Sequence, residues 1–239
     1  MALSPMPTSL PRRLLSRLHR MAFDRKPLFR RLLPLQPFSN VFGSDRGLPI
    51  DRYYIERFLG QNRQRIQGVA LEVAESMYVD RFGSDVERCD ILHYDGSDCE
   101  SATVIGDLCH PSTLPQNQYD CFVCTQTFQY LYDYEAGIRS THQLLRPGGT
   151  LLATLPTISR RSVADHQDWK EYWRFTPDAV ARGFAEVYGE ENVQVEAYGN
   201  VLAATAFLLG LAKHEIGRRK LDYYDPDYPM LVAVTAYKE

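Results

Sequence analysis

The sequence of 239 residues has no apolar run of about 18 residues, so it predicts no membrane-spanning helix. Its N-terminus contains arginines but lacks the continuous apolar stretch and small-residue cleavage site of a signal peptide. We therefore expect a protein of the cytoplasm. The sequence also has no large excess of charge, because 27 Lys and Arg residues face 30 Asp and Glu residues. That balance gives no general attraction to nucleic acid or to anionic lipid.

Cysteines are few: five, scattered along the chain, a number and spacing that favour reduced thiols over a disulfide framework. Cys121 and Cys124 have the C-x-x-C spacing of zinc or redox pairs, but they lie in an apolar run. Residues three apart on a strand point to opposite faces of a sheet, so we interpret both thiols as buried and inert. The sequence predicts no metal site.

Residues 1–45 differ in composition from the rest of the chain, which leaves 46–239 as one expected domain. Eight Lys and Arg residues between 12 and 31 surround Leu14, Leu15, Leu18 and Met21, the pattern of a short basic amphipathic helix. Three interpretations of residues 10–33 stay open: a helix packed on its own domain, a peripheral membrane contact, or a helix that binds a partner.

From residue 69 onward, short apolar runs alternate with helical stretches, the pattern of a parallel sheet covered on both faces. A helix entered at Pro49 is expected to precede this alternation. An uncharged helix is predicted over 201–211, either in the core or at the contact of a homodimer. The expected strands are 69–73, 86–92, 103–105, 120–124, 150–155, 193–197 and 231–236.

Six further pieces occur in a fixed order along these segments. They are Ala-Leu-Glu-Val at 70–73, Asp90, Gly-Asp-Leu at 106–108, 119–127, Leu-Leu-Arg-Pro-Gly-Gly-Thr-Leu-Leu at 144–152 and Trp-Arg-Phe-Thr-Pro at 173–177. In this order they resemble the class I S-adenosylmethionine (SAM) methyltransferases, particularly the small-molecule and glycan branch, over roughly residues 46–238. The resemblance implies an α/β, Rossmann-like fold, a seven-stranded, mostly parallel sheet with helices on both faces, and SAM as cofactor.

The resemblance places the cofactor beyond the carboxyl ends of the strands, where doubly wound sheets bind their ligands. Glu72 would take the ammonium group of SAM, directly or through water, Asp90 the ribose hydroxyls and Asp107 the adenine amino group. The cofactor residues that the resemblance implies are Glu72, Ala74, Asp90, Ile91, Asp107, Leu108, Thr125 and Gln126.

Glycine is missing where this family has a loop that reads roughly E-x-G-x-G-x-G, because residues 72–78 are Glu-Val-Ala-Glu-Ser-Met-Tyr. Glycine serves there to adopt positive φ and to let the ligand approach the backbone. Another residue in that conformation costs about 1 to 2 kcal/mol, against about 8 kcal/mol of binding free energy for a micromolar ligand. Two functions stay open: a working methyltransferase, or an inactive scaffold or binding module for a partner enzyme.

The segment after the fifth expected strand should overhang the pocket, so His166 is the candidate general base. Aromatic faces beside cationic side chains suit a sugar ring or a flat acceptor with an anionic group, although plain helix packing is the alternative. The acceptor residues expected on this ground are Tyr53, Tyr54, Trp169, Tyr172, Trp173 and Arg174. The expected activity is O-methylation of a sugar, glycan or secondary metabolite. Nucleic acid is not expected as a partner, because basic residues outside the N-terminal segment alternate with acids.

Overall fold

The computed structural model describes residues 34–96, 100–162 and 170–239. Its main compact unit runs from Phe38 to Glu239. Residues 38–45 pack within this unit: the Phe38 N–H donates to the Leu209 carbonyl at 2.8 Å, and Phe42 stacks on Phe207. None of the helices that the structure describes is long and apolar enough to cross a membrane.

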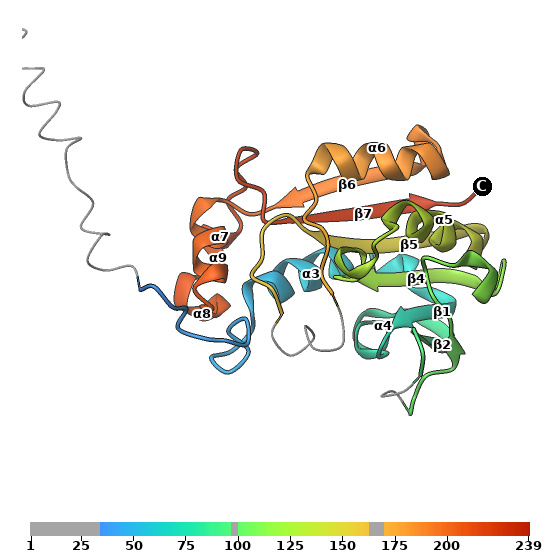
Figure 1. Ribbon diagram of the computed structural model, residues 1–239, viewed down its shortest axis with the longest axis horizontal. Helices are drawn as coiled ribbons and strands as arrows, with labels where there is room; N and C mark the ends of the chain where they lie inside the picture. Colours follow the sequence, from blue (N-terminus) through green and yellow to red (C-terminus); the bar gives the residue numbers. More distant parts are fainter. Residues whose placement is uncertain (1–33, 97–99, 163–169) are drawn as a thin grey trace, which may run out of the picture. The chain divides into compact units, whose positions relative to one another are not determined.

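One seven-stranded sheet forms the centre of the domain, with the strand order β3-β2-β1-β4-β5-β7-β6 (Figure 1). The first five strands in this order are parallel, and β7 is antiparallel to both of its neighbours. The seven predicted strands are confirmed at their expected places. They are β1 (Gln67–Val73), β2 (Asp85–His93), β3 (Val104–Ile105), β4 (Tyr119–Thr125), β5 (Leu145–Pro156), β6 (Val193–Tyr198) and β7 (Leu231–Tyr237).

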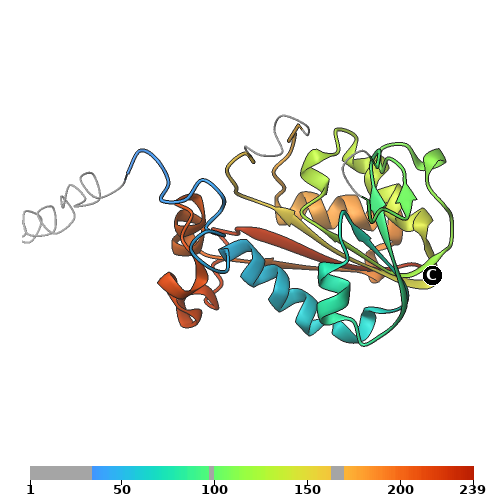
Figure 2. The same ribbon diagram turned by 90° about the horizontal axis from the view of Figure 1, so that it is seen from below.

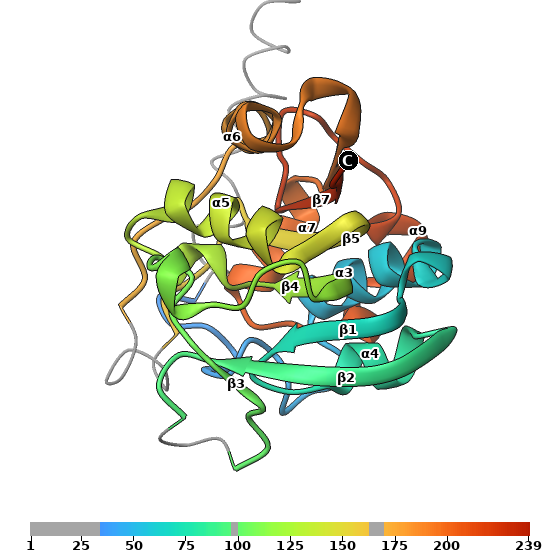
Figure 3. The same cartoon turned by 90° about the vertical axis from the view of Figure 1, so that its right-hand side faces the viewer.

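Helices cover both faces of the sheet. The described α-helices are α3 (Ile50–Gln61), α4 (Met77–Phe82), α5 (Tyr134–Leu144), α6 (Pro177–Tyr188), α7 (Val201–Leu208), α8 (Lys213–Ile216) and α9 (Arg218–Leu221). Helices α5 and α6 lie on one face, and α3, α4 and α7 lie on the other (Figures 2 and 3). The fold class expected from the sequence is thereby confirmed.

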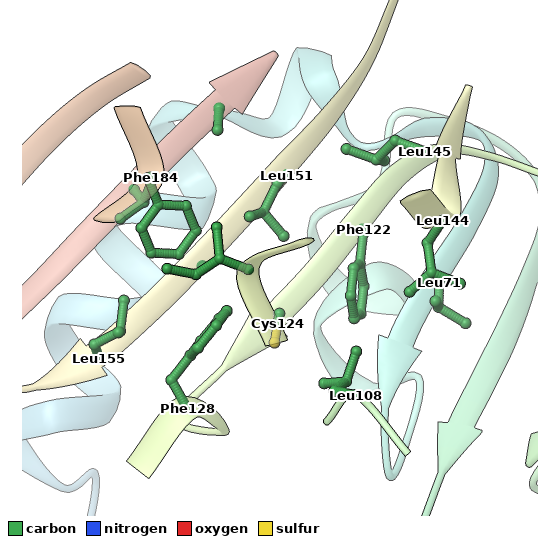
Figure 4. Packing of buried hydrophobic residues seen from close by; sticks show 14 of the residues in the cluster. Leu71, Leu108, Phe122, Cys124, Phe128, Leu144, Leu145, Leu151, Leu155 and Phe184 are labelled. Atoms are coloured by element: carbon green, nitrogen blue, oxygen red, sulfur yellow. The ribbon is translucent and has the colours of Figure 1, made fainter. Parts of the chain in front are cut away.

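Strand and helix boundaries follow from local chemistry. The central strands are apolar along almost their whole length because helices bury both of their faces. Leu71 and Phe122 thus pack with Phe184 on the α5 and α6 side of the sheet (Figure 4). The Asp133 carboxylate begins α5 by accepting from the Ala136 N–H at 2.9 Å, and Pro49 begins α3 as expected.

The two C-x-x-C cysteines lie on opposite faces of β4, as their spacing predicted. Cys121 belongs to the core under α3 and Cys124 to the core under α5 and α6. Burial raises the pKa of both thiols, that of Cys124 to about 12, which keeps them protonated. Among the residues that the structure describes, no group of three or more His, Cys, Asp or Glu side chains could hold a metal ion.

Helix α7 is partly core and partly surface. Ala203, Ala206 and Phe207 are buried, whereas Val201 and Leu202 are exposed. The predicted helix over 201–211 is therefore confirmed in type but ends at Leu208. An apolar residue on the outside of an uncharged helix is compatible with an oligomer contact.

Candidate cofactor and acceptor site

The parallel strands end together at what we call the carboxyl edge, formed by Val73, His93, Thr125 and Pro156. The chain passes from β1 outward to β2 and β3, then returns to β4 on the other side of β1. Strand order therefore reverses between β1 and β4, which is the position where doubly wound sheets bind ligands. The residues after these strands make up the candidate site.

The loop after β1 contains no glycine, yet one of its residues has a backbone conformation that is typical of glycine. Ala74, at the first expected glycine position, has φ of +68°, in the left-handed region. Its N–H donates to the Leu92 carbonyl at 2.9 Å, which fixes the loop to β2. Ser76, at the second position, has φ of −99° and precedes the first residue of α4. Only one of these two positions therefore requires the unusual backbone, at a cost of about 1 to 2 kcal/mol.

Glu72 fastens this loop to α4. Its side chain is buried, and its Oε2 accepts from the Val79 N–H at 2.8 Å, while both oxygens lie 3.1 Å from the Tyr78 N–H. Burial raises the pKa of Glu72 to about 7, although the two backbone N–H groups oppose this rise. The carboxyl group thus faces the start of a helix rather than open space, and its expected direct contact with the SAM ammonium group has no support in this geometry.

Tyr78 occupies the third glycine position and packs into the core. Its ring belongs to the cluster between α3, α4 and the sheet, and it stacks on Phe82. Arg52 of α3 holds it from the other side: the guanidinium carbon lies 5.6 Å from the ring centroid, and Nη1 donates to the phenol oxygen. The tyrosine is therefore accommodated by a neighbour on α3.

Asp90 does not lie where a ribose partner is expected. It is within β2, opposite Leu71, and the strand continues to His93. Its carboxylate pairs with Arg88 at 3.1 Å and accepts from the Tyr119 hydroxyl at 3.3 Å. Since Tyr119 begins β4, this contact points away from the carboxyl edge, and the expected ribose role of Asp90 is not supported. Ile91 is likewise inside the strand, opposite Glu72.

The first carboxylate beyond the end of β2 is Asp95. Its Oδ1 lies 3.4 Å from His93 Nδ1, and about half of its side chain is exposed. The sequence prediction missed Asp95 because Asp90 lies at the usual sequence distance from Glu72 for a ribose-binding carboxylate. The signal that could have found it is the predicted strand 86–92, because Asp90 precedes the end of that strand and Asp95 follows it; in the structure β2 ends at His93.

Asp107, Thr125 and Gln126 do lie at the carboxyl edge. Asp107 follows β3, where its Oδ1 accepts from the Cys109 N–H at 2.8 Å and its Oδ2 lies 2.7 Å from His110 Nδ1. Thr125 ends β4, and Gln126 follows with φ of +49°. The Gln126 N–H donates to the Thr154 carbonyl at 2.9 Å. Leu108, beside Asp107, is buried.

An aromatic cluster stands above the ends of β4 and β5. Its members are Tyr132, Tyr134, Tyr172, Trp173 and Phe175. The Tyr132 and Tyr172 ring centroids lie 5.1 Å apart, and those of Tyr134 and Trp173 lie 5.4 Å apart. Tyr132 and Tyr172 are 71% and 45% exposed, so the cluster offers ring surface to solvent. The sequence prediction included Tyr172 and Trp173 but missed Tyr132, in the loop after β4, and Tyr134, the first residue of α5.

Gln129 connects this cluster to the sheet. Its backbone carbonyl accepts from the Tyr172 N–H at 2.7 Å, and its Nε2 donates to the Gln126 carbonyl at 2.7 Å. Its side chain is only 5% exposed, and its Oε1 has no hydrogen-bond partner within the described chain. A buried amide oxygen without a donor costs free energy, so such a group points to a missing ligand or water.

Other predicted acceptor residues have structural partners. Tyr53 and Tyr54 are buried in α3, where Tyr54 donates to the Leu221 carbonyl at 2.8 Å and Tyr53 donates to Asp222. The structure thus places them in the core and not at a pocket, because the α3 face that carries them packs against α9. Arg174 pairs with Glu171 at 2.5 Å, within its own loop. His166 and Trp169 lie outside the described residues.

A cleft of about 530 Å³ lies at the opposite edge of the sheet, where β1 and β4 begin. Its lining includes Gly68, Asp120 and Arg146. Arg146 pairs with Asp120 at 2.9 Å, and Asp120 also accepts from the Val69 N–H at 2.8 Å. These charges satisfy one another, and the cleft is on the wrong edge for a doubly wound site.

Comparison with known proteins agrees with this topology. Residues 65–153, less than half of the chain, match a family model described as a methyltransferase domain. No curated protein sequence matches the chain. Among solved structures, a possible exported protein from Bordetella parapertussis has a TM-score of 0.50 and 14% identity, with 94% of this chain and 84% of that chain covered.

Two further solved structures have TM-scores of 0.49. One is a SAM-dependent methyltransferase from Archaeoglobus fulgidus, 10% identical, with 78% of this chain and 94% of that chain covered. The other is the 1,6-didemethyltoxoflavin-N1-methyltransferase of Burkholderia thailandensis with bound S-adenosylhomocysteine, 14% identical, with 99% of this chain and 94% of that chain covered. At such identities these likenesses concern the fold alone. The sheet order is that of the class I methyltransferase fold, and residues 65–153 of the chain match a methyltransferase domain.

Proposed function

We propose that the domain transfers the methyl group of SAM to a hydroxyl oxygen of a sugar, glycan or secondary metabolite. The observation that carries this proposal is the aromatic cluster with the unpartnered Gln129 Oε1 beside it, as seen within the described chain. Aromatic ring faces suit the C–H faces of a sugar ring, and an amide oxygen requires a donor such as a hydroxyl group. Together they favour an acceptor that is both ring-shaped and hydroxylated.

The cofactor fits the carboxyl edge through a smaller set of residues than the sequence implied. Ala74 supplies the left-handed turn after β1, and Asp107 supplies an acceptor for the adenine amino group with Leu108 beside it. Thr125 and Gln126 follow at β4. Asp95 replaces Asp90 as the carboxylate for the ribose hydroxyls, because it follows the end of β2.

The transfer is an in-line displacement. The acceptor oxygen bonds to the methyl carbon, the sulfur–carbon electron pair goes to sulfur to give S-adenosylhomocysteine, and the hydroxyl proton leaves to a base. Positioning supplies much of the rate in such a reaction, so an orienting surface of aromatic rings has a direct catalytic consequence. His166 is the base that we propose, in the segment that precedes Tyr172 and Trp173.

The glycine-free loop is the observation that would favour an inactive scaffold instead. The left-handed φ of Ala74 argues against that function, because the loop has kept its costly conformation. A module that binds no nucleotide has no use for this strain.

Calorimetry on the purified chain tests the proposal at its first step. We expect S-adenosylhomocysteine to bind, and methyl transfer to appear with hydroxylated ring acceptors. Trp173→Ala should raise the KM for the acceptor with little change in S-adenosylhomocysteine affinity, because Trp173 is in the aromatic cluster and not in the loop after β1. Tyr228→Ala, an exposed tyrosine before β7, is the matched control. Absence of nucleoside binding by the folded protein would support the scaffold.

A further inference from the structure

Asp51, in the first turn of α3, has a carboxylate oxygen that is buried from solvent and that accepts no hydrogen bond within the described chain. Its Oδ1 has no hydrogen-bond partner among the residues that the structure describes. On a helix, residues three, four and seven apart share a face, so Asp51 shares one with Tyr54, Ile55 and Phe58. Those three side chains are buried against the sheet. Asp51 therefore lies on the inner face of α3.

The first turn of α3 is at the carboxyl edge. One short turn, Arg63–Arg65, connects α3 to β1, so the last turn of α3 lies near the start of β1 and its first turn near the end of the sheet where β1 stops (Figure 2). The contact of the Arg52 guanidinium with Tyr78, in the first turn of α4, fixes this placement. Asp51 and Arg52 thus stand beside the loop from Ala74 to Ser76.

Asp51 and Arg52 have opposite charges, and in the protein without ligand neither forms a close ion pair within the described chain. Burial raises the pKa of Asp51, and the charge of Arg52 and the backbone N–H groups of Arg52 and Asp51 offset this only in part. Arg52 makes no salt bridge within 4.0 Å in the described part of the chain. Its guanidinium donates to the phenol of Tyr78, while the charges of Asp51 and Glu75 act on it without such a close contact. A buried carboxylate oxygen that accepts no hydrogen bond within the described chain, beside a guanidinium that forms no close ion pair there, is unfavourable unless a ligand completes both.

We propose that Asp51 binds the α-ammonium group of SAM and that Arg52 binds its α-carboxylate. The inference rests on the proposed use of SAM and assigns its amino acid end to α3. An ammonium group is a cationic donor for the free carboxylate oxygen, and a guanidinium group matches a carboxylate geometrically. Asp95, Asp107 and Gln126 are left for the nucleoside end at β2, β3 and β4.

The test compares two nucleosides that differ at the amino acid end. S-adenosylhomocysteine carries the ammonium and carboxylate groups, whereas 5′-methylthioadenosine lacks both. In calorimetry, Asp51→Asn and Arg52→Met should each weaken S-adenosylhomocysteine binding at least tenfold and leave 5′-methylthioadenosine binding within about twofold of the wild type. Glu56→Gln, a carboxylate on the same helix that pairs with Arg81, is the matched control and should change neither affinity.

Thermal unfolding supplies a readout that a purely structural role would not give. Without ligand, Asp51→Asn should unfold at an equal or higher temperature than the wild type at pH 8, because it removes a buried carboxylate that lacks a partner within the described chain. A loss of S-adenosylhomocysteine affinity together with unchanged or increased stability is the expected result. A residue that only holds the fold together would lower both.

Three outcomes would overturn the assignment. An equal loss of affinity for both nucleosides in the Asp51→Asn variant would mean that Asp51 contacts the adenosine part or only supports the fold. Unchanged S-adenosylhomocysteine affinity with an altered pH profile of kcat would make Asp51 the general base. Failure of the wild type to bind either nucleoside would refute the proposed function itself, and the assignment with it.

Discussion

Replacing Glu72 by glutamine should change how the stability of the domain depends on pH. The pKa of Glu72 is raised from 4.5 to about 7 because the carboxyl group is buried. Between these two values the folded state retains the proton and the unfolded state has released it. Stability is therefore lost as pH rises through this interval.

The difference between the two pKa values of Glu72 sets the size of the stability change. At 1.36 kcal/mol per pH unit, the distance from 4.5 to about 7 corresponds to a loss of about 3 kcal/mol. The glutamine side chain of the Glu72→Gln variant does not titrate, and its amide oxygen can still accept from the Val79 N–H that Glu72 Oε2 binds at 2.8 Å. The variant should therefore match the wild type near pH 4.5 and exceed it by up to about 3 kcal/mol at pH 8.

Denaturant unfolding of both proteins at several pH values between 4.5 and 8 measures this difference. Glu75→Gln is the control, because Glu75 is an exposed neighbour in the same loop. A stability difference that stays constant across the pH range would refute the reasoning. It would mean that the two N–H groups of α4 stabilise the carboxylate at least as much as burial disfavours it.

Ala74→Gly should change S-adenosylhomocysteine affinity by less than tenfold, because Ala74 already has the left-handed φ, and Ala74→Val should weaken binding in calorimetry by more. Adding Ser76→Gly to Ala74→Gly should not increase S-adenosylhomocysteine affinity further, since Ser76 has negative φ. Deletion of residues 1–37 should leave a single cooperative thermal transition, because the compact unit begins at Phe38. If the outer face of α7 joins two copies, Leu202→Lys should convert a dimer to a monomer in light scattering.

The strands of the sheet could be predicted because a strand that is buried on both faces is a continuous apolar run in the sequence. Strands such as β4 and β7 are continuous apolar runs, so residues 120–124 and 231–236 could be placed to within one or two positions. The order of the strands required more than the runs themselves. The resemblance to a family implied a seven-stranded, mostly parallel sheet, which the structure confirms, and the structure supplies the order.

The site was less predictable because it depends on where elements end and which way helices face. Asp90 was selected by its distance in sequence from Glu72, but it lies inside β2, which continues to His93. Tyr53 and Tyr54 were selected as N-terminal aromatics, yet their hydroxyl groups bind residues at the end of α9. The helical period by itself would have indicated Asp51, which is one turn before Tyr54 on the inner face.

The loop after β1 explains why the amino acid end of the cofactor would need a side-chain cation. A glycine loop that opens a helix normally offers backbone N–H groups to an anion. Here the Tyr78 and Val79 N–H groups of α4 are already bound by Glu72. Because the helix start is closed, a ligand carboxylate must find its donor elsewhere, and Arg52 holds the neighbouring guanidinium beside Tyr78. The substitution of tyrosine for the third glycine and the position of Arg52 are thus two parts of one arrangement.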